Sequence, residues 1–368
     1  MEEWKIYKIG DLFSHFKSGK GIKADEITPK GDYPVFGGNG LRGYTSRYNF
    51  EGDCAIIGRQ GAFCGNVRYF KGKAYMTEHA IIAVANDNNN TRFLAYLLGV
   101  MKLGRFSGQS AQPGLAVSEL AKQLISVPAL SLQNKIASIL SSLDDKIELN
   151  RRLNDNLQQQ AFALFDRLMI EAVDTECQVS EIAYLNPKRP LAKNKVARCI
   201  DMSQLSTSGA FPSGWEMKPF TGGMRFTNGD TLLARITPCL ENGKTAYIDF
   251  LDDEEIAFGS TEYIVLAPKE DIPPEYLYCL ARYPAFVDYA VKNMNGSSGR
   301  QRVSADTIGQ FVIPCPSETA IKDFGKVASA LFMKMKNNSL ENLKLSSLRD
   351  TILPKLMAGE IDVSNIQF

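Results

Sequence analysis

The chain carries an internal repeat whose period is about half of its 368 residues. Residues 52–57 (GDCAII) and 77–84 (TEHAIIAV) return in the same order as residues 229–234 (GDTLLA) and 261–266 (TEYIVL). Solenoid proteins repeat at about 20–50 residues, so a period this long indicates that a whole domain has been duplicated. Two similar modules in one chain suggest a molecule that reads two similar targets a fixed distance apart.

Composition narrows the class of protein. With 368 residues, 44% of them hydrophobic and 23% charged, the chain resembles ordinary globular proteins of two or three domains. No stretch approaches the roughly 18 apolar residues of a membrane span, and the N-terminus lacks the basic start and apolar run of a signal peptide. We therefore expect a cytoplasmic protein that makes no membrane contact.

Metal and cofactor sites are not expected. The seven cysteines form no Cys-x-x-Cys pair, and His15 and His79 are the two histidines, which is too few for the usual zinc sites. Residues 242–245 (NGKT) resemble the end of a phosphate-binding loop, but Pro238 stands where that pattern requires glycine. The cysteines are therefore expected to be small buried side chains in a reducing compartment.

The spacing of apolar residues and glycines divides the chain into four segments. Residues 1–130 and 174–316 contain short apolar runs between glycine-rich turns and then a helix, which predicts two similar mixed α/β domains. Residues 131–173 and 317–368 instead carry apolar side chains at alternating spacings of three and four. This spacing predicts one long amphipathic helix in each segment, and hence an α+β protein whose domains are joined by two long helices.

The two predicted helices have the length and pattern of a coiled coil. A helix of about 40 residues runs roughly 60 Å, and alone it would leave its apolar stripe in water. We predict that the two pack as an antiparallel coiled coil, with Asn150 opposite Asn338, because this register also aligns Leu143 with Leu345. The alternative is that each helix packs only on its own module.

No arrangement of residues typical of a catalytic site is present. Methyl transfer to a base amino group would require an Asp/Asn-Pro-Pro-aromatic loop and a glycine-rich cofactor turn, and neither occurs. Asp144 and Asp145 are paired carboxylates, but on a predicted helix such a pair is typical of a solvated face. We therefore expect a protein that is not itself an enzyme.

Polar, glycine-rich loops recur at matched positions in the two modules. Arginine, glutamine and asparagine can make bidentate contacts to base edges, and glycine lets the backbone approach a phosphate. Single loops of this kind are often ordinary turns, but their recurrence favours contact with nucleic acid. The candidate DNA-binding residues of the first module are Asn39, Arg42, Arg59, Gln60, Arg105, Gln109, Ser110 and Gln112. Those of the second module are Arg235, Thr237, Asn242, Lys244, Ser297, Ser298, Arg300 and Arg302.

Three segments resemble a known family. Residues 34–44 (PVFGGNGLRGY), 236–244 (ITPCLENGK) and above all 348–361 (LRDTILPKLMAGEI) are similar to those of the DNA-specificity (S) subunits of type I restriction-modification systems. The resemblance covers essentially the whole chain. It implies that residues 1–130 and 174–316 are target-recognition domains, each binding one half of a split site in double-stranded DNA, and that the long helices set the gap.

The same resemblance implies partners and a division of labour. Two adenine methyltransferase (M) subunits would dock on the helices, and restriction/translocase (R) subunits would complete an ATP-dependent endonuclease. The chain itself would then be a non-catalytic subunit without a cofactor. Two other classes remain open from the residues: a duplicated stand-alone enzyme, and a coiled-coil scaffold whose globular ends bind protein. Activity without partners would favour the enzyme, and the lack of salt-dependent DNA binding would favour the scaffold.

Overall fold

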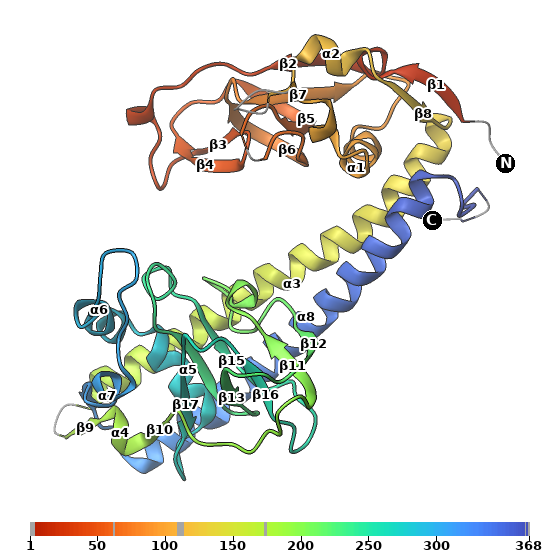
Figure 1. The fold of residues 1–368 in the computed structure, drawn as a ribbon. Coiled ribbons are helices and arrows are strands. Elements are labelled where there is room, and N and C mark those ends of the chain that lie inside the picture. The colour runs from red at the N-terminus through yellow and green to blue at the C-terminus, as the bar shows by residue number, and fades with distance from the viewer. Residues whose placement is uncertain (1–3, 62, 109–113, 173–174, 365, 367–368) are drawn as a thin grey trace. The chain divides into compact units, whose positions relative to one another are not determined.

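The computed structural model separates the chain into two compact units (Figure 1). The structure describes residues 4–61, 63–108, 114–172, 175–364 and 366. Unit 1 comprises the chain up to Asp145 together with the part from Ser346 onward, and unit 2 comprises Lys146–Leu345.

Unit 1 contains a six-stranded sheet in the order β2-β7-β5-β6-β3-β4. Its strands are β2 (Phe13–Ser18), β3 (Tyr33–Gly37), β4 (Gly40–Thr45), β5 (Phe50–Gly58), β6 (Val67–Met76) and β7 (Ala80–Ala85). All neighbouring strands are antiparallel except β3 and β6. The remaining elements are β1 (Lys5–Lys8) paired with β8 (Leu124–Val127), η1 (Ile9–Leu12), η2 (Ala24–Glu26), α1 (Thr91–Val100), η3 (Leu103–Phe106) and α2 (Val117–Ala121).

The apolar run of β5 explains its central place in this sheet. Ala55 and Ile57 point into the core that α1 covers, whereas Cys54 and Ile56 point into a smaller core on the other face. A strand buried on both faces reads as a continuous apolar run. Helix α1 begins after Asn90, whose side chain accepts a hydrogen bond from the Phe93 amide and so caps the helix.

Unit 2 contains two four-stranded sheets, in the orders β10-β17-β14-β15 and β12-β11-β16-β13. The first consists of β10 (Ala183–Leu185), β14 (Thr231–Ala234), β15 (Thr245–Tyr247) and β17 (Tyr263–Pro268). The second consists of β11 (Val196–Ile200), β12 (Glu216–Pro219), β13 (Met224–Phe226) and β16 (Ala257–Gly259). The remaining elements are β9 (Glu176–Gln178) paired with β18 (Val312–Pro314), α4 (Val179–Ile182), η4 (Met202–Gln204), α5 (Pro274–Arg282), α6 (Pro284–Lys292) and α7 (Ala305–Gly309).

The hydrogen-bond pattern confirms the internal repeat. In unit 1 the Arg59 amide donates to the carbonyl of His79, 2.9 Å away, and in unit 2 the Arg235 amide donates to the carbonyl of Glu262 at 3.0 Å. Strands β5 and β7 pair antiparallel, as β14 and β17 do. These contacts make Gly58 equivalent to Ala234 and His79 equivalent to Glu262, so the match of residues 52–57 with 229–234 and that of 77–84 with 261–266 are each one residue out.

Two long helices complete both units. Helix α3 (Leu130–Glu171) has 42 residues and α8 (Glu318–Met357) has 40. Their ends lie within two residues of the predicted segments 131–173 and 317–368, except that α8 ends at Met357. In unit 1, residues from the start of α3 share a core with Leu356 and Met357, and in unit 2 Phe165 of α3 meets Phe324 of α8. The predicted mixed α/β class and the antiparallel packing of the helices are confirmed.

The predicted register of the helix pair is wrong by about one turn. Asn338 donates to the side chain of Asn154 at 2.8 Å, and Asn150 donates to Glu341 at 2.7 Å and to Asn342 at 2.9 Å. Asn150 and Asn338 are both buried, so each is a polar residue within the stripe as predicted, but they do not face each other. A four-residue slip keeps the same helix face in contact, because an α-helix has 3.6 residues per turn.

The division of each helix between the units was not anticipated. Unit 1 takes the first part of α3 and the last part of α8, so the compact units cut both helices in their middle. The assignment of recognition domains to 1–130 and 174–316 and of spacer segments to 131–173 and 317–368 stays a prediction. None of the helices that the structure describes is long and apolar enough to cross a membrane.

Candidate nucleic-acid interface

Close backbone packing brings together three loops of unit 1. The β3–β4 turn lies against the end of β5 and the turn before β7: a Cβ atom on Gly38 would stand 3.1 Å from the carbonyl oxygens of both Gln60 and His79. Side chains larger than glycine would separate these loops. The candidates Asn39, on the same turn, and Gln60 are both exposed, so the structure places two predicted contact residues on adjoining loops.

Arg59 anchors this loop cluster from within. Its side chain donates to the carbonyl of Leu115 at 3.3 Å and to the hydroxyl of Ser18 at 3.4 Å, and the side chain is only partly exposed. The Leu115 amide also donates to the Arg59 carbonyl, 2.9 Å away. Arg59 therefore ties the end of β5 to the segment that begins at residue 114. The candidates Gln109, Ser110 and Gln112 lie outside the described residues.

Further arginines surround the β3–β4 turn. Arg42 is exposed on β4, and a Cβ on Gly37 would meet its side chain at 2.7 Å. Arg68, on β6, is also exposed, and its guanidinium carbon would stand 3.0 Å from a Cβ on Gly40. The comparison of repeated loops in the sequence did not select Arg68, because this residue lies in a strand. Its place between the apolar side chains of Val67 and Tyr69 could have marked it as a residue on the exposed face of that strand.

Arg105 lies apart from that turn, in η3. It is exposed, and its guanidinium lies over the ring of Phe106, 4.7 Å from the ring centre. The neighbouring Gly104 packs on Gly65, where a Cβ would come within 2.1 Å of the Gly104 amide nitrogen. Arg105 thus faces solvent from a second surface element of the same unit.

In unit 2 the equivalent loops are held by an internal ion pair. The Arg302 guanidinium donates hydrogen bonds of 2.7 to 3.0 Å to the carboxylate of Glu262. These bonds hold the pKa of Glu262 below its usual range. The Val303 amide donates to the Arg235 carbonyl, and the Thr237 amide donates to the Gln301 carbonyl. These bonds therefore join the segments that carry Arg235, Thr237 and Arg302, and the ion pair of Arg302 with Glu262 holds them together.

Two polar atoms in this cluster have no partner within the described chain. The Nε atom of Arg235 and the hydroxyl of Thr237 are buried and accept or donate no hydrogen bond there. Buried polar atoms are usually satisfied, so an unsatisfied pair in one loop marks a place where a ligand or water would complete the bonding. Arg235 differs in this respect from Arg59, whose side chain donates hydrogen bonds to Leu115 and Ser18.

The other candidates of unit 2 fall into two groups. The Lys244 ammonium donates to the carbonyl of Met202 at 2.7 Å and so holds a neighbouring loop. Asn242 is exposed on the same turn. A second exposed turn, closed by a 2.9 Å bond from the Arg300 amide to the Ser297 carbonyl, carries the candidates Ser297, Ser298 and Arg300. Among the described residues no group of three or more His, Cys, Asp or Glu side chains is placed to hold a metal ion.

Comparison with known proteins shows what the chain is similar to. The family model described as the type I restriction modification DNA specificity domain matches residues 1–159. The first 159 residues are therefore similar to this family. The specificity subunit of the type I restriction enzyme EcoprrI from Escherichia coli is 38% identical over 146 residues, which cover 39% of this chain and 36% of that protein. The match thus spans little more than a third of the length of that relative.

Two longer matches cover nearly the whole chain. The specificity subunit of the MjaIX enzyme of Methanocaldococcus jannaschii is 22% identical, with 99% of this chain and 95% of that protein covered. The crystal structure of a type I restriction-modification S subunit from M. genitalium superposes with a TM-score of 0.62 at 22% identity, covering 96% of each chain. This likeness shows that the chain has the fold of a type I specificity subunit.

Proposed function

We propose that the chain is the sequence-specific DNA-binding subunit of a type I restriction-modification enzyme, and that it recognises a bipartite target with one half-site per recognition domain. The observation that carries this proposal is the repeat: two equivalent strand pairs end in loops that present exposed polar side chains. Side chains of this kind read base edges in the major groove, and arginine also binds phosphates.

The candidate residues divide into those that contact DNA and those that shape the loops. We propose base or phosphate contact for the exposed set, which comprises Asn39, Arg42, Gln60, Arg105, Asn242, Ser297, Ser298 and Arg300. Arg235 and Thr237 join this set because their buried polar atoms lack partners. Internal bonds assign support of the loops to Arg59, Lys244 and Arg302. Gln109, Ser110 and Gln112, which lie outside the described residues, stay in the contact set.

The chain would act together with other subunits. Two methyltransferase subunits docked on α3 and α8 would methylate adenines, and restriction/translocase subunits would cut the DNA. The proposed role of this chain is to place that chemistry on the DNA without taking part in it. The two relatives described above are named specificity subunits, which supports this division of labour.

Selection from a random DNA library tests the proposal. The full chain, purified with its methyltransferase subunits, should enrich a motif of two short sequences separated by a fixed gap. Gln60→Ala should relax one half-site and Asn242→Ala the other, at about 1–3 kcal/mol per lost bidentate contact. Lys122→Ala, which breaks only an exposed ion pair with Glu119, is the control and should leave the motif unchanged. Enrichment of an undivided motif would contradict the proposal.

A further inference from the structure

Helix α1 of unit 1 is attached to α3 at two separated points. The first is at the start of α3, where the buried amide of Gln133 donates to the side chain of Asn89 and accepts from the amide of Asn90, both at 2.9 Å. Asn134 also accepts from the Asn90 side chain at 2.8 Å. Together these bonds fix the N-terminal end of α1.

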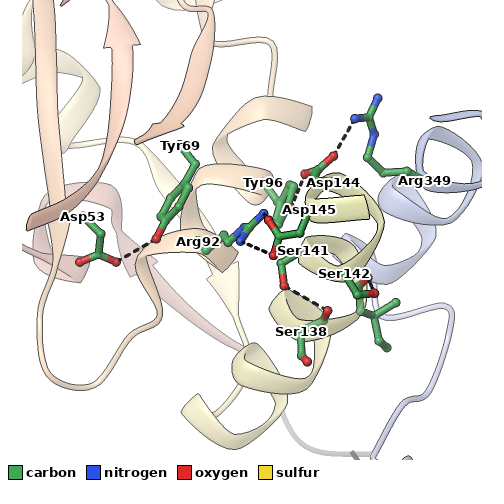
Figure 2. A network of polar contacts seen from close by, with 11 residues as sticks. Asp53, Tyr69, Arg92, Tyr96, Ser138, Ser141, Ser142, Asp144, Asp145 and Arg349 are labelled. Carbon is green, nitrogen blue, oxygen red and sulfur yellow. Dashed lines mark hydrogen bonds and ion pairs between the residues drawn. The ribbon is translucent and has the colours of Figure 1, made fainter. Parts of the chain in front are cut away.

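The second point lies three helical turns further along α3 (Figure 2). Arg92 binds the Asp145 carboxylate with both terminal nitrogens, at 2.8 and 3.3 Å, and Tyr96 donates to Asp144. The other oxygen of Asp144 accepts from Arg349 of α8 at 2.7 Å. The expectation of a solvated face is therefore wrong for Asp144, whose side chain is 28% exposed, whereas Asp145 binds Arg92 with its side chain still 66% exposed.

The network continues from α1 into the sheet. The Arg92 guanidinium lies 5.1 Å from the centre of the Tyr69 ring on β6, and the Tyr69 hydroxyl donates to Asp53 on β5 at 3.5 Å. Burial, reinforced by the neighbouring carboxylates, raises the pKa of both Tyr69 and Tyr96, so both phenols remain hydrogen-bond donors at neutral pH. A continuous set of contacts thus joins the sheet, α1, α3 and α8 of unit 1.

Unit 2 attaches its equivalent helix mainly through aromatic rings, with one hydrogen bond from the Tyr278 hydroxyl to Gln158 of α3 at 3.4 Å. Helix α5 meets α3 through the rings of Tyr276 and Phe165, with centroids 5.0 Å apart, and it meets α8 through Tyr278 and Phe332 at 5.5 Å. Aromatic packing is strong but does not prescribe one pairing of charges. Bidentate Arg–carboxylate contacts do prescribe geometry, because both partners are planar and directional.

We propose that Arg92, Asp144 and Asp145 are positioning residues that fix the angle of the first recognition domain on its spacer helices, and thereby restrict the gap between half-sites. The inference rests on the proposed function. Gln133 and Asp144 are about 16 Å apart along α3 at 1.5 Å per residue. The core that α1 shares with Ile136 and Leu140 already holds the start of α3, and the second attachment point extends this hold to Asp144 and Asp145 and so fixes the angle of the helix beyond Leu140. A base pair advances the site by about 3.4 Å, so a small rotation of the domain brings the next gap length within reach.

A gap-length series tests this role. The full chain is purified with its methyltransferase subunits, and methylation is measured on DNA that carries both half-sites at the preferred gap and at gaps one and two base pairs shorter and longer. Asp144→Asn combined with Asp145→Asn should reduce the preference for the wild-type gap over its neighbours at least five-fold. The sequences of both half-sites should not change, since no base-contacting residue is altered.

Three further variants make the result decisive. Arg167→Gln removes an exposed ion pair with Glu171 on the same helix and should keep the wild-type gap profile. Asp145→Glu retains the charge and should retain most of the preference. Arg92→Lys retains the charge but cannot bind in bidentate fashion, and it should broaden the gap profile even if the double variant does not fold.

Two results would overturn the inference, and they are distinguishable. A gap profile equal to that of the wild type in Arg92→Lys and in the double variant, with a lower melting temperature, would mean that the network only stabilises unit 1. A wild-type complex that methylates no divided site would refute the proposed function, and this inference with it.

Discussion

The buried amide pair Asn154 and Asn338 should be energetically coupled. Asn338 is 3% exposed and donates to Asn154, and Asn154 donates in turn to the Met335 carbonyl at 3.2 Å and to the Ser339 hydroxyl at 3.1 Å. The perturbation is the replacement of each asparagine by leucine, singly and together.

The structure sets the expected magnitude. Asn338→Leu leaves the Asn154 carbonyl oxygen without its donor, and an unsatisfied buried acceptor costs about 1–3 kcal/mol. Because Asn154 is partly exposed, water relieves some of this cost, so we expect about 1–2 kcal/mol for each single variant. The double variant removes both partners and should cost less than either single one, since apolar replacement of a whole buried pair is often neutral or stabilising.

Urea unfolding measures these differences in unit 2. The chain has two tryptophans, so in a Trp4→Phe background the fluorescence of Trp215 reports the unfolding of unit 2. The control is Asn156→Leu, because Asn156 is exposed and bonds only to Gln160 on the same helix; its effect should stay within about 0.5 kcal/mol. Additive single effects, with no coupling energy, would show that the two amides do not meet and that the register is different.

Three more predictions follow from particular contacts. Burial outweighs the adjacent Arg189 guanidinium and raises the pKa of Asp230 to about 6, so the folded state favours the protonated acid. The stability of the wild type relative to Asp230→Asn should therefore fall, by roughly 3 kcal/mol, as pH rises from about 4 to above 6, and urea unfolding across that range checks this. Adding one heptad after Asn154 and one after Asn338 lengthens the helix pair by about 10 Å, so methylation sequencing should find a gap about three base pairs longer; an unchanged gap would mean that the helices do not measure distance. Asn154→Cys combined with Asn338→Cys should form a disulfide efficiently, and Asn150→Cys combined with Asn338→Cys should form one poorly, as peptide mass spectrometry would show. Efficient crosslinking of the second pair alone would support the register in which Asn150 faces Asn338.

The repeat and the long helices could be predicted because both are periodic signals within one segment of sequence. The helix register could not, since a shift of four residues still aligns apolar side chains: Asn150 and Asn154 lie one turn apart on neighbouring parts of the same face. Only the three-dimensional pairing decides which of the two meets Asn338.

The candidate site was predicted in its loops but not in the roles of its side chains. Arg302 and Lys244 looked like free cations, yet their partners Glu262 and Met202 lie about 40 residues away along the chain and come close only in the folded domain. The importance of Asp144 and Asp145 was missed for the same reason, because a helix seen alone gives no sign of the arginines that reach it from α1 and α8. The local pattern therefore selects the candidate loops, whereas long-range pairing decides which of their side chains remain free to contact a ligand.

The central claim, that each half of the chain reads one half of a divided DNA site, is tested most directly by exchange of one domain. Residues 174–316 would be replaced by the corresponding segment of another specificity subunit, and adenine methylation would be sequenced in cells that express the hybrid with its methyltransferase. We predict a divided motif in which one half-site and the gap are retained and the other half-site is replaced. A motif in which both halves change, or neither changes while methylation persists, would contradict it.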